Sequence, residues 1–144
     1  MTTVQVVPVG LVTDEVLEAF HRLIPQLSSS SSPITMTELD EIVGNTSIVL
    51  FAARADGLII GLLTLVIFRI PTGLRAWIED VVVDDRARGK GVGEALNRAA
   101  LSTARQRGAK TVDLTSRPSR EAANRLYQRL GFVRRDTNVY RFEL

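Results

Sequence analysis

Cysteine is absent from the 144-residue chain. The protein therefore has no disulfide framework and no cysteine-ligated metal site, and the composition fits a reducing compartment. There is a single histidine, His21, so a two-histidine metal site is excluded. No G-x-S-x-G turn accompanies it, which argues against a serine hydrolase. We expect no metal and interpret His21 as a surface or helix-packing residue.

Long apolar runs and strong charge are also missing. The longest apolar run, residues 57–68, is too short to span a bilayer and indicates a buried strand. The first ten residues lack the charged and apolar blocks of a signal peptide. Net charge is only +2, and aromatic residues are not interleaved with the basic ones. We therefore expect a cytoplasmic protein without a membrane or nucleic-acid partner.

The length and a hydrophobic content of 45% predict one domain over residues 1–144. Apolar periodicity, caps and turn residues predict the order β-α-α-β-β-β-α-β-α-β-β, a mixed sheet with helices on both faces. Helices are expected after a Thr13 cap, over 35–44, over 91–107 and after a Ser119 cap. The expected strands are 3–9, two strands within 47–68 that turn at Asp56-Gly57, 75–83, 111–116, 132–135 and 139–144.

The segment RGKGVG (88–93) follows a valine-rich strand and opens a predicted helix. Gly91 and Gly93 let the backbone approach a ligand, and the helix directs its positive dipole end at the same point. Together with nearby cations, this predicts a site for a phosphate or pyrophosphate. Neither the Walker pattern nor the dinucleotide fingerprint fits. The alternative is a solvated basic turn at a helix start.

Arg88, Gly91 and Gly93 form R-x-x-G-x-G, which resembles the acyl-CoA loop of the GNAT superfamily of N-acetyltransferases. The acidic pair in WIEDVVVDD, the segment AANRLYQRLGF (122–132) and the predicted element order add to the resemblance. It implies an α/β (α+β) GNAT fold, a central mixed, mostly antiparallel sheet of about seven strands flanked by about four helices. It also implies acetyl-CoA as cosubstrate, with a non-catalytic acyl-CoA-binding module as the alternative.

The same resemblance implies how acetyl-CoA is held. Backbone amides of the loop and of the first helical turn would bind the pyrophosphate, and the pantetheine arm would lie along strand 81–83 like an added strand. Asn124 could contact that arm or simply face solvent, and Arg120, where many relatives carry asparagine, could reach a CoA phosphate. The implied cofactor contacts are Val81, Val82, Val83, Arg88, Gly89, Lys90, Gly91, Val92, Gly93, Glu94 and Asn124.

Acetyl transfer to an amine needs a neutral amine and a proton for the leaving thiolate. By resemblance Tyr127 is the acid; the alternative is an ordinary aromatic residue on a buried helix face. Glu79 and Asp80 are candidates for base or positioner, and only one can face the cleft because strand neighbours point to opposite faces. We favour Glu79, against the alternative of an ion pair with Arg75. Trp77 is either core or cleft wall.

The sequence leaves the acceptor open. A primary amine of a small molecule or peptide fits, and the acidic pair favours a cationic one. The serine-rich segment 28–32 is hypothesised to become ordered when the acceptor binds. The resemblance also implies a homodimer that pairs through sheet edges or C-terminal strands.

Overall fold

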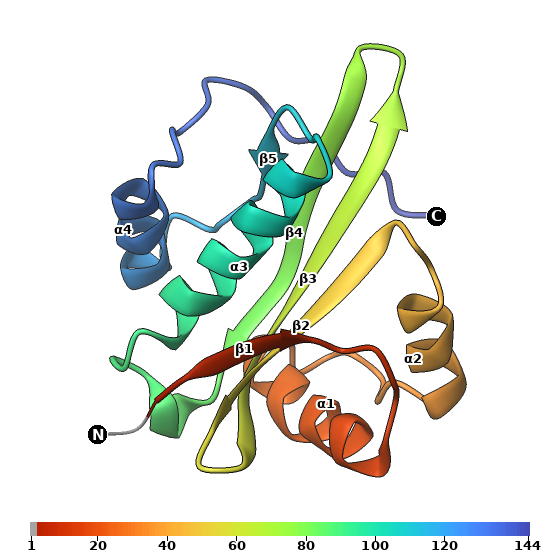
Figure 1. Cartoon of the computed structure of the whole chain (residues 1–144). Coiled ribbons are helices and arrows are strands. Elements are labelled where there is room, and N and C mark those ends of the chain that lie inside the picture. Colours follow the sequence, from red (N-terminus) through yellow and green to blue (C-terminus); the bar gives the residue numbers. More distant parts are fainter. Residues whose placement is uncertain (1–2) are drawn as a thin grey trace.

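The computed structural model describes residues 3–144 and contains one open sheet with helices on both faces (Figure 1). The five strands lie in the order β1-β2-β3-β4-β5. The first four pair antiparallel, and β5 pairs parallel to β4. The predicted mixed, mostly antiparallel sheet is confirmed, with fewer strands than expected. The elements are β1 Gln5–Pro8, α1 Asp14–Leu27, α2 Met36–Val43, β2 Ile48–Ala55, β3 Leu58–Ile70, β4 Gly73–Val83, the short 3-10 helix η1 Asp85–Ala87, α3 Val92–Gln106, β5 Val112–Asp113 and α4 Glu121–Leu130.

The first two helices begin at threonine caps. Thr13 Oγ1 accepts a hydrogen bond from the Val16 N–H at 3.3 Å, as the sequence predicts. Thr35 Oγ1 accepts from the Glu38 N–H at 3.1 Å, and the Glu38 carboxylate accepts from the Thr35 N–H at 2.9 Å. These bonds satisfy donors that a helix start leaves without an intrahelical partner.

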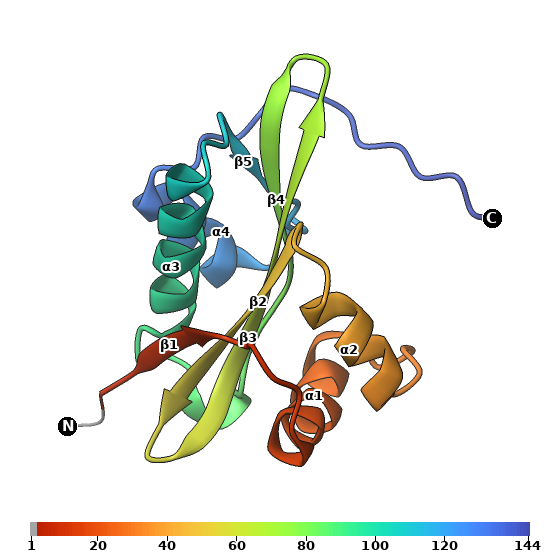
Figure 2. The same cartoon turned by 45° about the vertical axis from the view of Figure 1, so that its right-hand side comes forward.

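The sheet separates two apolar cores, one beneath α1 and α2 and the other beneath α3 (Figure 2). Gly61 of β3 lies directly beneath the start of α3. A Cβ atom on Gly61 would lie 2.9 Å from Val92 Cγ1 and 3.0 Å from Leu96 Cδ1. The glycine therefore lets the first turn of α3 sit directly on β3.

The β2–β3 connection is the tight hairpin that Asp56-Gly57 predicts. Both residues have positive φ, 52° and 75°, as this two-residue turn requires. The hairpin aligns two long strands whose buried residues contribute to both cores. β3 of this hairpin in turn pairs with β4 and sets its position in the sheet.

The C-terminal part departs from the prediction. The strand expected over 111–116 is reduced to β5, and residues 132–135 and 139–144 form no strand. The last residues instead extend away from the body (Figure 2). A strand pattern forms a ladder only beside another strand, and no strand within residues 3–144 pairs with this segment. Ser119 is not the cap of α4: a turn from Arg117 to Arg120 puts Arg120 at that position, without a side-chain capping bond.

Candidate functional site

The loop between β4 and α3 ends at a helix start whose backbone N–H groups have no side-chain acceptor. Gly89 and Gly91 both have φ of +78°, which favours glycine strongly over any other residue. Gly91 is the N-cap of α3 and offers no side-chain hydrogen bond to the helix. The N–H groups of the first turn thus remain available to an external acceptor. A helix start of this kind attracts an anion.

Gly93 lies at a close contact between two helices, and its predicted approach to a ligand stays a prediction. A Cβ atom there would lie 3.2 Å from Leu126 Cδ2 of α4 and 3.9 Å from Val83 Cγ2 of β4. The missing side chain lets α4 lie close to the start of α3. Gly93 is therefore explained by helix packing, and Gly91 by its backbone conformation.

Glu94 also joins α3 to α4. Its carboxylate accepts hydrogen bonds from Arg98 and from Arg129, each at 3.3 Å. These two bonds lower the pKa of Glu94. The predicted cofactor contact at Glu94 can thus be made by its backbone N–H, because its side chain is engaged with α4.

Asp84 fastens the other end of the loop to α1. Its side chain is buried, and its Oδ2 lies 3.2 Å from Nη1 of Arg22. The same guanidinium donates to the Ile59 carbonyl oxygen at 2.9 Å. Burial alone would raise the pKa of Asp84, but hydrogen bonds from Arg86 and the charges of Arg86 and Arg22 lower it on balance. Sequence reasoning missed this anchor; its signal was an aspartate directly after the VVV run.

A β-bulge interrupts β4 at the acidic pair. Between the pairs Thr64–Glu79 and Leu62–Val82, β4 contains one residue more than β3. Asp80 lies in this bulge with φ of +50°, a conformation that costs free energy for a residue other than glycine. The bulge interrupts the regular ladder beside Glu79. Strain of this kind is found preferentially at functional sites.

The edge of β4 beyond Trp77 is open. β5 pairs with Ala76 and Trp77 only, and from there to Val83 no strand among the described residues covers that side. Edge N–H and C=O groups are a template for an added extended segment. The predicted pantetheine contacts of residues 81–83 fall on this edge.

Glu79 has a hydrogen-bond partner other than the arginine considered from sequence. Trp77 Nε1 donates to Glu79 Oε1 at 2.7 Å, whereas Arg75 Nη2 donates to Thr72 Oγ1 at 3.2 Å. Trp77 also forms part of the wall of a cleft of about 320 Å³. The structure therefore places Trp77 at a cleft and Glu79 beside it. The cleft is lined by Phe68, Ile70, Arg75, Ala76, Trp77, Thr111, Asp113 and Arg135.

Tyr127 lies on α4, one residue after the leucine that contacts Gly93. Burial raises its pKa above the usual 10.0, and the positive charge of Arg120 opposes that rise. Its ring meets Phe132 edge-on, with centroids 5.7 Å apart. The phenol therefore holds its proton throughout the neutral range, which an acid requires.

Asn124 holds the loop in front of α4. Its Nδ2 donates to the carbonyl oxygens of Arg117 and Arg120, at 2.9 and 2.8 Å. The amide nitrogen is thus engaged within the chain. A contact between Asn124 and a pantetheine arm would therefore use its side-chain oxygen.

The single histidine lies outside this site. His21 Nε2 is 2.7 Å from the Ile34 carbonyl oxygen and ties α1 to the segment before α2. Among residues 3–144 no group of three or more His, Asp or Glu side chains could hold a metal ion. Within the same range, no helix has the length and apolar character needed to cross a bilayer.

Comparison with known proteins identifies the family. The model of the acetyltransferase (GNAT) family matches residues 15–132, and the chain belongs to this family. It is 36% identical to N-alpha-acetyltransferase 30 of Schizosaccharomyces pombe over 73 residues, which are 51% of this chain and 48% of that protein. The chain therefore aligns with about half the length of this curated relative.

Two solved structures share the fold. A putative acetyltransferase from Agrobacterium tumefaciens superimposes with a TM-score of 0.84 at 23% identity, over 96% of this chain and 99% of that one. An aminoglycoside N-acetyltransferase in complex with CoA gives 0.83 at 19% identity, over 99% and 96%. At these identities the similarity establishes the fold alone. It confirms the GNAT architecture that the sequence implied.

Proposed function

We propose that this protein transfers an acetyl group from acetyl-CoA to a primary amine of a small molecule or peptide. Family membership supports acetyl transfer in general. The observation that carries the proposal is the start of α3, which has no side-chain capping bond and follows two left-handed glycines, Gly89 and Gly91, in the loop between β4 and α3. This arrangement presents converging N–H donors to a pyrophosphate.

The cofactor contacts follow from that geometry. Main-chain N–H groups from Arg88 to Gly93, and those of the first turn of α3, bind the two phosphates. The open edge of β4 from Val81 to Val83 accepts the extended arm. Bound in this way, acetyl-CoA supplies an activated acetyl thioester. A relative with this fold was solved in complex with CoA, which supports the same ligand here.

The proposed roles of the polar side chains are divided between two sides of the site. Glu79 Oε2 takes a proton from the acceptor ammonium, or holds the cation, while Oε1 accepts from Trp77. Tyr127 donates its phenolic proton to the departing thiolate, since burial keeps that proton bound. Asp80 is the second candidate for base. Holding both reactants against β4 supplies much of the remaining acceleration.

The proposal also covers the kind of amine acceptor, the cellular location of the protein and its oligomeric state. The exposed carboxylates of Glu79 and Asp80 favour a cationic amine. Segment 28–32 lies between α1 and α2, and its residues 29–32 are exposed, which fits a loop that becomes ordered with acceptor. We place the protein in the cytoplasm and expect it to work as a homodimer, without a metal.

Two measurements test the proposal. Titration calorimetry with acetyl-CoA and CoA should show saturable binding, and a thiol-release screen over amino sugars, polyamines, aminoglycosides and peptide N-termini should identify amines that accelerate release. Absence of binding to either compound contradicts the proposal. Binding without amine-dependent release would favour the alternative, a non-catalytic acyl-CoA-binding module.

A further inference from the structure

One face of β4 carries a cation, an indole and a carboxylate in a line. Arg75, Trp77 and Glu79 are alternate residues of this strand, so their side chains leave the same face of the sheet. The register places Phe68 of β3 beside Arg75 and Asp113 of β5 beside Trp77. At 3.3 Å per residue, the Cα atoms of Arg75 and Glu79 lie about 13 Å apart. The two opposite charges are therefore separated by the length of a small molecule.

The indole of Trp77 forms the apolar middle of this line. Its Nε1 donates to Glu79 Oε1 at 2.7 Å, which ties the ring to the carboxylate at one end. The ring also forms a wall of the cleft of about 320 Å³, together with Phe68 and Ile70 of β3. That volume is at the lower end of the range for small-molecule sites. The cleft therefore suits a small ligand with an apolar centre.

The charged side chains of the cleft have no charged partners. Arg75, Arg135 and Asp113 all line it, and within residues 3–144 none of them forms an ion pair. Arg75 donates only to the Thr72 hydroxyl, at 3.2 Å. Two guanidinium groups against one carboxylate leave one positive charge in excess. This balance favours a ligand group with a single negative charge.

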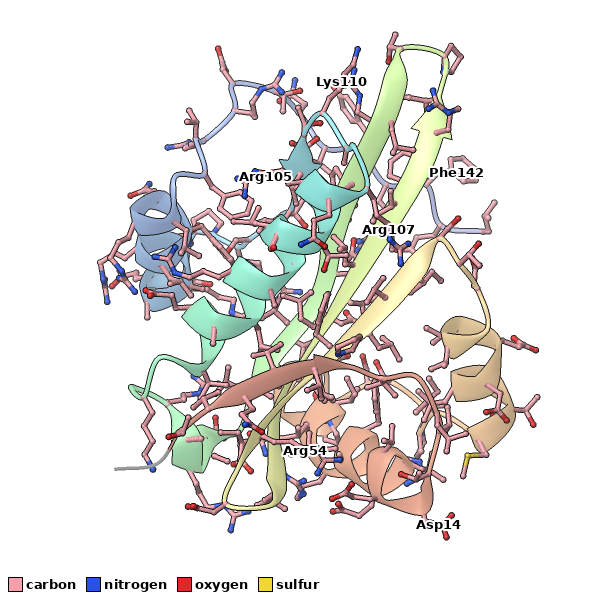
Figure 3. All side chains as sticks on the ribbon, in the orientation of Figure 1. Asp14, Arg54, Arg105, Arg107, Lys110 and Phe142 are labelled. Atoms are coloured by element: carbon pink, nitrogen blue, oxygen red, sulfur yellow. The ribbon has the colours of Figure 1, made fainter. Side chains whose placement is uncertain are left out.

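The hairpin end of β4 is positive and the bulge end is negative. Lys110, labelled in Figure 3, lies at the hairpin end, where its Nζ donates to the Thr72 carbonyl oxygen at 3.4 Å. Its charge adds to that of Arg75. At the other end, Glu79 and Asp80 are exposed beside the bulge. A ligand with both charges would therefore direct its anion toward the hairpin and its ammonium toward the bulge.

We propose that the acceptor is a small zwitterion, with its primary amine at Glu79, its carboxylate at Arg75 and an apolar spacer against Trp77. This inference rests on the proposed acetyl transfer. A guanidinium binds a carboxylate through two parallel N–H bonds. A phosphate monoester is mostly dianionic at neutral pH and matches the single excess charge less closely. A short apolar peptide with a free C-terminus has all three parts.

The orientation agrees with the proposed cofactor site. The amine end lies next to the bulge, and the open edge from Val81 to Val83 begins just beyond it. The carboxylate end points away from that edge. An extended tripeptide spans roughly 10 Å, and the long side chain of Arg75 can cover the rest of the distance. The acceptor nitrogen is thus the part of the ligand nearest to the proposed thioester.

Fluorescence of Trp77, the only tryptophan, tests the zwitterion in the absence of acetyl-CoA and again with saturating CoA. The probes are alanyl-phenylalanyl-alanine and the same tripeptide as its C-terminal amide. In wild type the Kd of the free acid should be lower than that of the amide by about 10-fold or more, because only the acid forms charge-assisted bonds with Arg75.

Arg75→Gln should remove that preference and bind both peptides as wild type binds the amide. The matched control is Arg69→Gln, which removes an exposed cation from the same hairpin. Arg69 pairs with Leu74 and lies on the opposite face of β3 from Phe68, so the preference should stay. In thiol release, Arg75→Gln should raise KM for the free acid by about 10-fold and leave kcat near wild type, since the contact is distant from the reacting atoms.

Four outcomes overturn the zwitterion. They are equal affinity of wild type for acid and amide, equal loss of preference in both arginine variants, no saturable change with either peptide, and tighter binding of glucosamine 6-phosphate than of the free acid. The last result would assign a phosphate to Arg75 instead of a carboxylate. The proposed acetyl transfer would fail separately, in calorimetry with acetyl-CoA and CoA, so the two failures are distinguishable.

Discussion

The helices on the two faces of the sheet begin differently. α1 and α2 start at Thr13 and Thr35, whose hydroxyl groups accept backbone N–H bonds of the first turn. α3 and α4, on the other face, start at Gly91 and Arg120 without a side-chain capping bond. The first pair of helices therefore has side-chain acceptors for first-turn N–H groups within the chain itself. The second pair leaves first-turn N–H donors without a side-chain acceptor, and the loop before α3 contains two glycines with positive φ.

A second difference concerns what fixes each region. The start of α3 is held from several directions, by Gly61 beneath it, by Leu126 of α4 against Gly93, and by Asp84 bound to α1. Residues 133–144, after α4, have none of these contacts. Rigid surroundings suit a site that presents backbone donors without rearrangement.

The largest expected effect comes from blocking the uncapped helix start. Gly91→Asp should abolish CoA binding in calorimetry, because a side chain strains the left-handed backbone and adds negative charge where phosphate binds. Gly108→Asp is the matched control, with φ of +85° at the other end of α3 and nothing within 4 Å of its added Cβ. It should be strained similarly yet bind CoA as wild type does. If both variants lose CoA affinity equally, the loss is due to backbone strain and not to a blocked phosphate site.

Tyr127→Phe should lower kcat by about 100-fold, since it removes the proton donor for the thiolate. CoA affinity measured by calorimetry should stay near the wild-type value. Because the folded pKa of Tyr127 lies above 10.0, the proton is retained below that pH, so loss of rate from its ionisation should occur only above pH 10. If the Tyr127→Phe variant keeps the full rate with a true acceptor, Tyr127 is not the acid and serves only in packing.

Glu79→Gln should raise the pH needed for turnover, because bulk hydroxide must then deprotonate the ammonium that the carboxylate served. At neutral pH we expect a rate lower by about 10-fold or more. A pH profile of kcat/KM for this variant and for Asp80→Asn compares the two neighbours directly. If only Asp80→Asn shifts the profile, the base is Asp80.

Asp84→Asn should lower the free energy of unfolding by about 2–3 kcal/mol at pH 7, because it leaves Arg22 without its buried partner. The folded pKa of Asp84 is lowered from 3.8, so its contribution is present above that pH and is lost as pH falls through the folded value. Urea unfolding of variant and wild type should therefore converge in acid. Glu18→Gln removes the exposed partner of the same arginine and should change little; equal losses would contradict the anchoring role.

The smallest expected effect concerns the face of the sheet covered by α1 and α2, whose helices begin at threonine caps. Thr35→Ala should lower the free energy of unfolding by about 1 kcal/mol, because it removes the side-chain acceptor at the start of α2. CoA binding should not change, since α2 lies on the opposite face. Urea unfolding and calorimetry on the same sample check both parts. A weaker affinity for CoA would show that the two faces are coupled.

Short-range sequence signals predicted the helix start at Thr13, the β2–β3 hairpin and the loop at 88–93. The Thr13 cap predicted the start of α1, and Asp56-Gly57 predicted the hairpin, because each depends on bonds within a few residues. The loop at 88–93 could be predicted for the same reason. Ser119 failed as a cap because the turn before α4 is set by the Arg120 N–H bond to the Arg117 carbonyl. The catalytic roles of Glu79 and Tyr127 stay predictions.

By itself the sequence determined the order of elements as far as α4, the apolar faces and the left-handed glycines, since these follow from backbone preference and side-chain spacing. Tertiary structure alone decided the bulge at Asp80 and the Arg22–Asp84 contact, because each depends on strand register or on packing between distant segments. It also decided that residues 132–135 and 139–144 form no strand. A strand exists only with a neighbour, and whether a neighbour is present depends on the arrangement of the whole molecule.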